Sequence, residues 1–388
     1  MDKGPSTTLI HSGEGQFARV ASLTTPIYET TSYVFESADA VRRYNESQSG
    51  QFLYSRYENP TVMSAEAKVA AADGAERALL FGSGMAASST LLMALLKAGD
   101  EVVCSAAVYG GTFHLLNDFL SRFGIVTRFV TIDELARPET LITDRTRLFW
   151  FESPINPHLR CVDVRRVAKA CRARGVTSVI DNTFASPINQ RPLEMGIDLS
   201  MQSATKYLNG HSDVTAGVVS GREALMEPVN LARRKLGGVL DPQAAYALGR
   251  ALKTLPLRVA RHNANAMAVA SALEGHPRLA RVYYPGLPSH PDHAIATQQM
   301  SGFGGMVCLD VANGEAGACR TFDRLTIIKR AVSLGGVESV CSLPRLISPW
   351  GHSDEQLAKA GITKGMMRLS IGLEDADDLI ADLTQALA

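Results

Sequence analysis

From about residue 60 onward, the sequence alternates between runs with helical spacing and short strand-like runs, and this alternation constrains the fold most. NPTVMSAEAKVAAADG and MAASSTLLMALLKAGD are typical of helices, and ERALLFGSG between them indicates a strand that enters a glycine-rich loop. Further short runs, rich in β-branched or aromatic residues, predict strands at EVVCS, IVTRFV, TRLFWFES, VTSVID and AGVVSG. Such alternation predicts an α/β fold on a mostly parallel sheet.

After about residue 225, a long helical stretch interrupted at Pro256 precedes three strand-like runs, GGMVCLDV, IIKRAVSLGG and MMRLSIG. A chain of 388 residues is longer than one hydrophobic core usually serves, so we expect two domains. Residues 1–60, which are polar and rich in turn residues, should form an arm that needs a surface to lie on. Residues 61–250 should form the large α/β domain, and residues 251–388 a smaller α+β domain.

Composition narrows the class of protein. The 39 basic and 39 acidic side chains cancel, which argues against a nucleic-acid or membrane-surface partner. The six scattered cysteines form no C-x-x-C pair, so we expect no metal site and no disulfide framework, and reduced thiols suit the cytoplasm. The first residues lack the apolar core of a signal peptide, and no run approaches the ~18 apolar residues of a membrane span.

Open α/β sheets bind ligands in loops at the carboxyl ends of their strands, and three polar loops are predicted at such positions. The first is FGSGMAAS, residues 81–88, a glycine-rich turn from a strand into a helix. Backbone N–H groups at a helix N-terminus suit a phosphate, although packing of a tight turn explains these small residues equally well. The turn matches neither G-x-G-x-x-G nor a Walker motif.

The second and third loops carry ionisable side chains. Asp181 ends the apolar run SVID, where it either caps the next turn or pairs with a protonated heterocyclic nitrogen. Lys206 follows 206 − 181 = 25 residues later in SATKYLNGHSDVTAG, near the hydroxyls of Ser203 and Thr205. Most lysines are solvated surface charges, but an amine among small polar residues after a strand suits Schiff-base formation. Together the three loops are far more specific than any one of them.

With these loops, the chain resembles the PLP-dependent family of cysteine and methionine metabolism, whose members include cystathionine γ-synthases, γ-lyases and β-lyases, methionine γ-lyases and O-acylhomoserine sulfhydrylases. The resemblance runs from TTPIYETTSYVF to MMRLSIGLED, and SATKYLNGHSDVTAG is its most specific segment. It implies pyridoxal 5′-phosphate (PLP) as cofactor and the fold type I PLP-dependent transferase architecture, with a seven-stranded sheet in the large domain. It also implies a homotetramer, a dimer of dimers, with active sites shared across each dimer.

The resemblance assigns the cofactor contacts residue by residue. Lys206 would hold PLP as a Schiff base and act as the base at Cα, Tyr109 in AVYGGT would stack over the ring, and Asp181 would bind the ring nitrogen. The implied phosphate contacts are Gly84, Met85, Ser203 and Thr205 from the same chain, and Tyr54 and Arg56 of YSR from the arm of the neighbouring subunit.

The same resemblance implies the substrate contacts. Asn156 in ESPINP would lie near the phenolic oxygen of PLP and the substrate carboxylate, which the guanidinium of Arg368 would bind. Without the family, Arg368 reads as one exposed side chain at a strand edge. The backbone at Ser333 and Leu334 would border the site. Glu338 either attracts a distal ammonium or is a solvated glutamate, and both interpretations stay open.

The implied activity is γ-elimination or γ-replacement on a sulfur amino acid or an O-acylhomoserine. Cystathionine β-lyase, methionine γ-lyase and O-acylhomoserine sulfhydrylase are the alternatives, and Gly111 disfavours the second because methionine γ-lyases carry a cysteine there. The segment LPRLISPWGH, with Arg345, Pro349 and Trp350, departs from the family pattern and leaves the specificity open. A cofactor-free binding protein or a nicotinamide-dependent enzyme is disfavoured by Lys206 and Asp181, and by the absent G-x-G-x-x-G.

Overall fold

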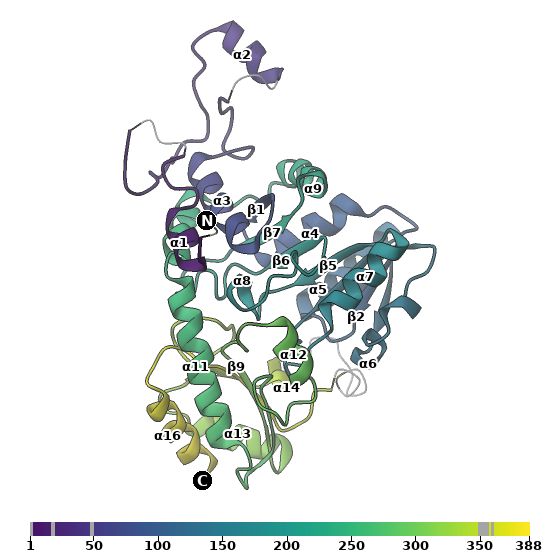
Figure 1. The fold of residues 1–388 in the computed structure, drawn as a ribbon, viewed down its shortest axis with the longest axis vertical. Coiled ribbons are helices and arrows are strands. Elements are labelled where there is room, and N and C mark those ends of the chain that lie inside the picture. Colours follow the sequence, from purple (N-terminus) through teal and green to yellow (C-terminus); the bar gives the residue numbers. More distant parts are fainter. Residues whose placement is uncertain (1–2, 17–19, 47–49, 348–356, 358–360) are drawn as a thin grey trace.

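The computed structural model describes residues 3–16, 20–46, 50–347, 357 and 361–388. The described chain is built on two separate sheets, one of seven strands and one of five. Figure 1 shows the larger sheet, with its helices, in the upper part of the molecule and the smaller sheet in the lower part. The prediction of a large α/β unit followed by a smaller α+β unit is confirmed.

The seven-stranded sheet has the strand order β1-β7-β6-β5-β4-β2-β3. All neighbouring pairs are parallel except those of β7, which runs antiparallel to both β1 and β6. The expected mostly parallel sheet is therefore present. Its strands are β1 (Arg77–Phe81), β2 (Glu101–Ser105), β3 (Val126–Val130), β4 (Thr146–Glu152), β5 (Thr177–Asp181), β6 (Leu199–Gln202) and β7 (Gly217–Gly221).

Helices cover both faces of this sheet. On β1, Leu79 and Phe81 join the core beneath α4 and α9, whereas Ala78 and Leu80 point the other way, toward α3 and α10. Local signals set the bounds of α3: the Asn59 side chain accepts from the N–H of Thr61, Pro60 opens the first turn, and Gly74 ends the helix with φ 67°. The helices between residues 60 and 252 are α3 (Pro60–Asp73), α4 (Gly84–Leu95), α5 (Gly110–His114), α6 (Ile132–Leu135), α7 (Val164–Arg174), α8 (Ser186–Asn189), α9 (Glu223–Leu236) and α10 (Pro242–Leu252), with a π-helical turn at Leu115–Phe119 and 3₁₀ turns at Leu120–Phe123 and Pro138–Thr140.

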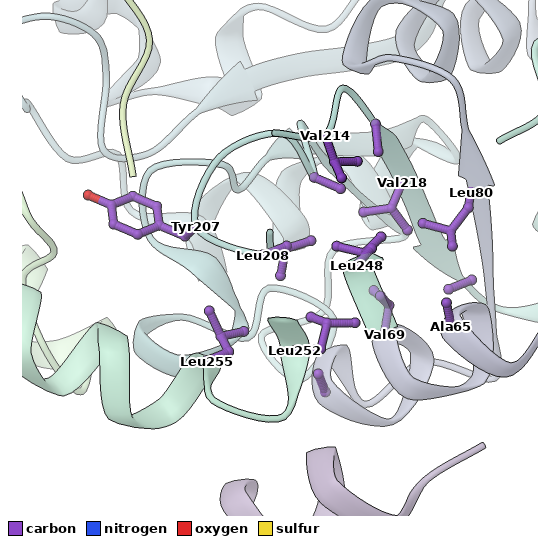
Figure 2. Close-up of a cluster of buried hydrophobic side chains, with 14 of the residues drawn as sticks. Ala65, Val69, Leu80, Tyr207, Leu208, Val214, Val218, Leu248, Leu252 and Leu255 are labelled. Atoms are coloured by element: carbon purple, nitrogen blue, oxygen red, sulfur yellow. The ribbon is translucent and has the colours of Figure 1, made fainter. Parts of the chain in front are cut away.

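The core on the α3 and α10 side reaches directly to the predicted catalytic loop. Leu208 and Tyr207, the two residues after Lys206, belong to a core cluster with side chains from α3, β1, β7 and α10. Figure 2 shows Leu208 within this cluster and the Tyr207 ring at its margin. Leu208 is 1% exposed and Tyr207 2% exposed. Burial of a leucine side chain contributes about 1.5–3 kcal/mol, so the loop is held by the core of the large domain.

The five-stranded sheet has the order β10-β11-β12-β9-β8 and is antiparallel except for the β10–β11 pair. Helix α11 contacts both β8 and β9 of this sheet, and α8 of the large domain, so it joins the two parts of the molecule. The remaining elements are β8 (Leu279–Tyr283), β9 (Met306–Val311), β10 (Lys329–Arg330), β11 (Val340–Ser342), β12 (Met366–Ser370), α11 (Leu255–Leu273), α12 (His293–Gln299), α13 (Gly314–Arg324), α14 (Pro344–Ile347) and α16 (Ala376–Leu387). No described helix is long and apolar enough to cross a membrane.

Some elements differ from the sequence prediction. The run IIKRAVSLGG forms a strand only at Lys329–Arg330, because Ser333 and Gly335 adopt φ values of 85° and 73°, which end an extended strand. The long helical stretch divides two residues before Pro256, which then lies in the first turn of α11, where a proline costs no hydrogen bond. Strands β6, β8 and β11 had not been expected.

The segment before residue 60 has two short helices and little other regular structure. Helix α1 (Pro5–His11) packs on α3 and α11, and its Leu9 is fully buried. The Lys68 ammonium on α3 fixes this helix by donating to the carbonyls of Leu9 and Ser12, both at 2.7 Å. Figure 1 shows the following segment with α2 (Ala38–Asn45) reaching away from the rest of the chain.

Candidate active site

The candidate site residues of the large domain meet at one edge of the seven-stranded sheet. Asp181 ends β5, Glu152 ends the neighbouring β4, and the turn with Lys206 follows β6. Because β7 is antiparallel to both β1 and β6, these two strands run in the same direction. The loops after β1 and β6 therefore emerge at the same edge, as ligand-binding loops do in open α/β sheets.

The glycine-rich turn after β1 is closely packed against the loop after β6. A Cβ added at Gly84 would lie 3.1 Å from the Ser203 hydroxyl, and one at Gly217, the first residue of β7, would lie 2.2 Å from the carbonyl oxygen of Ser83. Ser83 caps α4 by accepting from the N–H of Ala86 at 3.0 Å. The N-terminus of α4, with its dipole, and the Ser203 hydroxyl thus form a compact cradle suited to an anion.

Asp181 lies partly buried at the end of β5. Its Oδ1 accepts from the backbone N–H and the hydroxyl of Thr183, and no hydrogen bond to Oδ2 is found within the described residues. The Thr183 hydroxyl in turn accepts from the N–H of Ser203 at 2.8 Å, which couples this carboxyl to the Gly84–Ser203 cradle. Burial raises the pKa of Asp181, and the two bonds from Thr183 oppose that rise.

Glu152 is a buried carboxyl that the sequence analysis missed. It pairs with Asp181 across the β4–β5 ladder and accepts from the N–H of Tyr109 at 2.6 Å. Burial, and secondly the nearby charge of Asp181, raise the pKa of Glu152 well above its ordinary value. Two adjacent buried carboxyls do not both ionise readily, so the negative charge of one opposes ionisation of the other. The available signal was an acidic residue ending an apolar strand, TRLFWFE, which is the same signal that identified Asp181 in SVID.

Tyr109 is the N-cap residue of α5 and is 53% exposed. A Cβ added at Gly111 would lie 2.6 Å from the Tyr109 ring and 2.8 Å from the sulfur of Met85. Tyr109, Met85 and Gly111 are therefore neighbours, and the missing side chain at residue 111 makes room for the phenol ring. Two predicted site residues, Tyr109 and Met85, are brought together here.

Lys206 lies in the turn after β6 and donates from Nζ to the Ser333 hydroxyl at 2.5 Å. Burial, and secondly the nearby positive charge of Arg368, lower the pKa of Lys206 from 10.5 to about 8. Near neutral pH the neutral, nucleophilic amine is therefore roughly a tenth of the total, far more than for an ordinary lysine. This is the change in protonation that the predicted Schiff-base chemistry needs.

Arg368 reaches the same serine from the small domain. Its guanidinium donates to the Asn156 side-chain oxygen at 3.0 Å and to the Ser333 carbonyl at 3.2 Å. Strand β12 lies between β11 and β9, so Arg368 is on an interior strand and not at the sheet edge that the residue alone had suggested. Burial lowers its pKa. Lys206, Asn156, Ser333 and Arg368 thus form one connected cluster, with the buried Leu334 beside it.

Three predicted site residues make other contacts in this chain. The Thr205 hydroxyl donates to the Ala216 carbonyl and accepts from its N–H, both at 3.0 Å. The exposed Glu338 accepts from the Ser212 hydroxyl at 3.2 Å. Arg56 donates to the carbonyl of Arg234 at the end of α9.

Tyr54, a further predicted site residue, lies beside Arg56, whose guanidinium carbon is 5.7 Å from the tyrosine ring centroid. Among the contacts recorded for described residues, neither Tyr54 nor Arg56 touches Lys206 or Arg368 of the same chain. Of the atypical segment, Arg345 lies 3.6 Å from Glu315, whereas Pro349 and Trp350 lie outside the described residues.

A site chosen by cavity volume alone would lie at the wrong edge of the sheet. A cavity of about 590 Å³ lies at the opposite edge of the sheet, where Thr177 begins β5, Leu199 begins β6 and Gly221 ends β7. It is lined by residues such as Asp198 and Arg222, which already form an ion pair at 2.9 Å. Lys206, Asp181 and Glu152, the site residues whose pKa values are shifted, all lie at the other edge of the sheet. Among the described residues, no group of three His, Cys, Asp or Glu side chains could hold a metal ion.

Comparison with known proteins agrees with this geometry. Residues 6–388 match the model of the family described as Cys/Met metabolism PLP-dependent enzyme. The chain is 41% identical to cystathionine gamma-synthase 1, chloroplastic, of Arabidopsis thaliana, over 97% of this chain and 68% of that protein. It is 41% identical to L-methionine gamma-lyase of Pseudomonas putida, over 99% of this chain and 97% of that protein.

The fold also matches a solved structure. The crystal structure of metB from Corynebacterium glutamicum superposes with a TM-score of 0.93 at 36% identity, covering 99% of this chain and 98% of that one. The match includes both the seven-stranded sheet and the smaller sheet domain. With a family match along almost the whole chain, relatives of about 40% identity and the Lys206 cluster in place, the chain belongs to the Cys/Met metabolism PLP-dependent enzymes.

Proposed function

We propose that this enzyme catalyses γ-elimination or γ-replacement on a sulfur amino acid or an O-acylhomoserine, as cystathionine γ-lyases and γ-synthases do. The observation that carries the proposal is the meeting of Lys206 and Arg368 at Ser333, one at its hydroxyl and the other at its carbonyl. An amine base and a carboxylate-binding fork at one residue suit an α-amino acid whose Cα proton is to be removed. The names of the relatives support the γ position.

The residues present fit PLP. The Gly84–Ser203 cradle at the N-terminus of α4 suits the phosphate, and the free Oδ2 of Asp181 suits a protonated ring nitrogen. The lowered pKa of Lys206 suits its bond to the aldehyde. When bound, PLP supplies the aldehyde that joins the substrate amine and a ring that accepts the electron pair released at Cα. We assign Gly84, Met85, Ser203, Asp181, Asn156 and Tyr109 to cofactor binding, with Thr205 as a secondary contact.

We assign the proton transfers to Lys206 and Tyr109. Arg368 binds the substrate carboxylate in a bidentate manner and so orients the Cα–H bond, while Asn156 holds the guanidinium in place. The Lys206 amine takes the Cα proton, and Ser333 keeps that amine on the Arg368 side of the site. The Lys206 amine, after passing on the Cα proton, also takes a proton from Cβ. The γ substituent then leaves with its bonding electron pair, and the exposed Tyr109 phenol donates a proton to it.

The chemistry of this proposal is tested by product analysis. Purified protein is incubated with PLP and L-cystathionine, and the products are identified by mass spectrometry. Cysteine, 2-oxobutyrate and ammonia are expected, whereas homocysteine and pyruvate would show β-cleavage and overturn the assignment. Parallel incubations with O-succinylhomoserine, O-acetylhomoserine and methionine, each with and without a thiol, separate replacement from elimination. Lys206→Ala protein is the control for reactions of free PLP.

Methionine γ-lyase is the alternative that the relatives favour equally by identity. The packing at Gly111 opposes it, because a side chain there would meet the Tyr109 ring and the Met85 sulfur. A cysteine at residue 111 would therefore require a different position of Tyr109. Substantial turnover of methionine alone would favour this alternative. Cystathionine β-lyase and O-acylhomoserine sulfhydrylase are distinguished by the same product assay.

The arm of residues 1–60 is proposed to complete the site of a second subunit in a homotetramer, beside a PLP-binding domain of residues 61–250 and a C-terminal domain of residues 251–388. Support comes from the segment that reaches away from the chain in Figure 1 and exposes Val34 at 95% and Leu23 at 94%. Within the described residues, the Arg56 side chain donates a hydrogen bond only to a backbone carbonyl. Its positive charge is therefore available to bind a phosphate.

Subunit mixing tests the shared site. Lys206→Ala and Arg56→Ala proteins are each expected to lose activity, and a refolded mixture is expected to regain part of it. A mixed dimer has one site with both changes and one site with neither. If the mixture is no more active than the two separate proteins, Arg56 acts within its own chain. Light scattering gives the number of subunits independently.

We also propose that the enzyme works in the cytoplasm. All six cysteines are free thiols, and five of them are buried. Burial raises the pKa of the thiol of Cys171 to about 12, which keeps it protonated and unreactive. Cell fractionation followed by immunodetection of the protein tests this location.

A further inference from the structure

Helix α11 carries a row of three buried polar side chains on one face. Arg258, His262 and Asn265 are spaced at i, i+4 and i+7, and they are 5%, 0% and 2% exposed. We name them the α11 polar row. Polar side chains this deeply buried are costly unless they are hydrogen-bonded, so their partners indicate what the row holds.

The first member of the row binds the turn of Lys206. The Arg258 guanidinium donates to the carbonyl of Tyr207 at 2.7 Å and to that of Leu208 at 3.2 Å. It also donates to the carbonyl of Ala251 at 3.0 Å. Among the described residues, no carboxylate forms an ion pair with Arg258, so backbone carbonyls of the Lys206 turn and of α10 stabilise this buried cation.

The other two members bind the end of β12. His262 donates from Nδ1 to the carbonyl of Ile371 at 2.7 Å, three residues after Arg368. Asn265 donates from Nδ2 to the carbonyls of Gly372 at 3.0 Å and Glu374 at 2.7 Å. Burial lowers the pKa of His262 to about 4, so the ring is neutral and its Nδ1 carries the proton.

A second set of contacts also links the turn of Lys206 to the end of β12. The His262 ring packs edge-on against the ring of Tyr207 with centroids 5.2 Å apart. The Tyr207 hydroxyl accepts from the N–H of Gly305 at 3.1 Å, and the carbonyl of Gly305 accepts from the N–H of Ile371 at 2.8 Å. The residue after the candidate catalytic lysine is thereby tied to the strand that carries Arg368.

From this geometry we infer that the α11 polar row is a positioning device that sets the distance between the Lys206 amine and the Arg368 guanidinium, and thereby the preference of the site for an α-carboxylate. The members of the row touch neither the substrate nor the cofactor, and they act through the backbone on either side of the site. The inference rests on the proposed binding of the substrate carboxylate by Arg368.

The test compares two ligands that differ only in the carboxylate. L-Norleucine and pentylamine bear the same carbon chain and amine, and neither has a γ leaving group. Their binding to PLP-loaded enzyme is followed by the change in visible absorption. The ratio of the two affinities measures the carboxylate preference, and PLP affinity and melting temperature are measured alongside.

His262→Leu removes the donor and keeps much of the volume, whereas His262→Asn retains an N–H near the position of Nδ1. We expect His262→Leu to lower the norleucine-to-pentylamine ratio by about three- to tenfold, the coupling typical within one hydrogen-bond network, with PLP affinity unchanged. His262→Asn should restore the ratio. Arg261→Ala is the matched control, because Arg261 lies on the exposed side of the same helix and also binds the Glu374 carbonyl, at 3.2 Å.

The outcomes separate this inference from the proposed function. If Arg368→Leu leaves the carboxylate preference intact, the assignment of Arg368 is wrong. If Arg368→Leu abolishes the preference but His262→Leu lowers only the melting temperature, the row is merely structural and the inference fails. A loss of preference in Arg261→Ala as large as that in His262→Leu would also overturn it.

Discussion

The candidate active site has two halves that are built in different ways. The cofactor half consists of Gly84, Asp181, Ser203 and Lys206, which end or follow strands of the seven-stranded sheet. The substrate half consists of Arg368 on β12 of the smaller sheet, and of Ser333 and Leu334 in the segment between its strands β10 and β11. In the first half the strand ends themselves bring the residues together. In the second, one side chain from the interior of an antiparallel sheet reaches across the domain boundary.

This difference predicts separate roles for the two halves in binding PLP and in binding substrate. A parallel sheet places the loops after its strands at one edge, so the cofactor half follows from the topology of the fold. The substrate half depends on how the second domain is docked, since among the described residues the hydrogen bonds of Arg368 and Lys206 meet at Ser333. Changes in the cofactor half should therefore affect the affinity for PLP, and changes in the substrate half should affect the affinity for substrate.

The largest effect is expected at the centre of the cofactor half. Lys206→Ala should lower kcat by roughly 10³-fold or more, because we assign the base for proton transfer to this residue. Borohydride reduction followed by peptide mapping should find the pyridoxyl group on residue 206 of the unchanged protein and on no residue of the variant. Lys253→Ala, which removes a lysine paired with Glu14 at 2.7 Å, should keep the label. A label that persists in Lys206→Ala protein would refute the assignment.

In the substrate half, Arg368→Leu should lower kcat/KM by roughly 10- to 100-fold, which corresponds to the loss of a hydrogen-bonded charge. The dissociation constant of PLP should stay the same, because the guanidinium contacts Asn156 and Ser333 and not the Gly84–Ser203 cradle. Arg368→Lys keeps the charge without the planar fork, so its kcat/KM should lie between that of the unchanged protein and that of Arg368→Leu. Equal losses of PLP and substrate affinity would break the division between the halves.

The pKa of Lys206 depends on both halves of the site. Burial, and secondly the charge of Arg368, lower it to about 8. The rate at which apoprotein captures PLP should rise with pH, because the neutral amine attacks the aldehyde. With this pKa the rise between pH 7 and pH 9 is about tenfold and then levels off, whereas an unshifted lysine gives about a hundredfold rise without a plateau. Stopped-flow absorption measures the rate. Arg368→Leu should move the plateau to higher pH, and an unchanged profile would contradict the coupling.

The smallest effect is expected at Glu338, which the family resemblance predicts as a further substrate contact. The residue is exposed and bonded only to Ser212 among the described contacts, so Glu338→Gln should change kcat/KM by no more than about fivefold. The loss should appear with cystathionine, which has a distal ammonium, and not with O-acetylhomoserine. Equal losses with both substrates would make Glu338 an ordinary surface residue.

The same contrast explains what the sequence could predict. Asp181 ends an apolar strand-like run, so its place at the sheet edge followed from the βα pattern, whereas β6, the strand before Lys206, was not predicted. Arg368 occupies an interior strand, but its neighbours Asn156 and Ser333 are 212 and 35 residues away in sequence. No local pattern encodes such a contact, and only the family resemblance indicated it.

The strands that the prediction missed have a physical reason as well. Strand β6 is four residues long, LSMQ, and is buried on both faces although half of its side chains are polar. Strand β11 has only three residues. Pairing with the longer strands β5 and β7 stabilises β6, and pairing with the longer β12 stabilises β11, and a local propensity cannot reveal that contribution. Glu152 was missed for a different reason, because the family resemblance assigned a role in ESPINP to Asn156 and none to the glutamate that begins it.

The antiparallel strand β7 has one further consequence. It inserts its first residue, Gly217, between the strands whose loops build the anion cradle, so close to Ser83 that any side chain would displace the turn. A random-mutagenesis screen scored on cofactor loading should therefore return position 217 among its strongest hits. Cofactor loading depends at this position on the lack of a side chain. The residue itself offers no functional group and belongs to the scaffold.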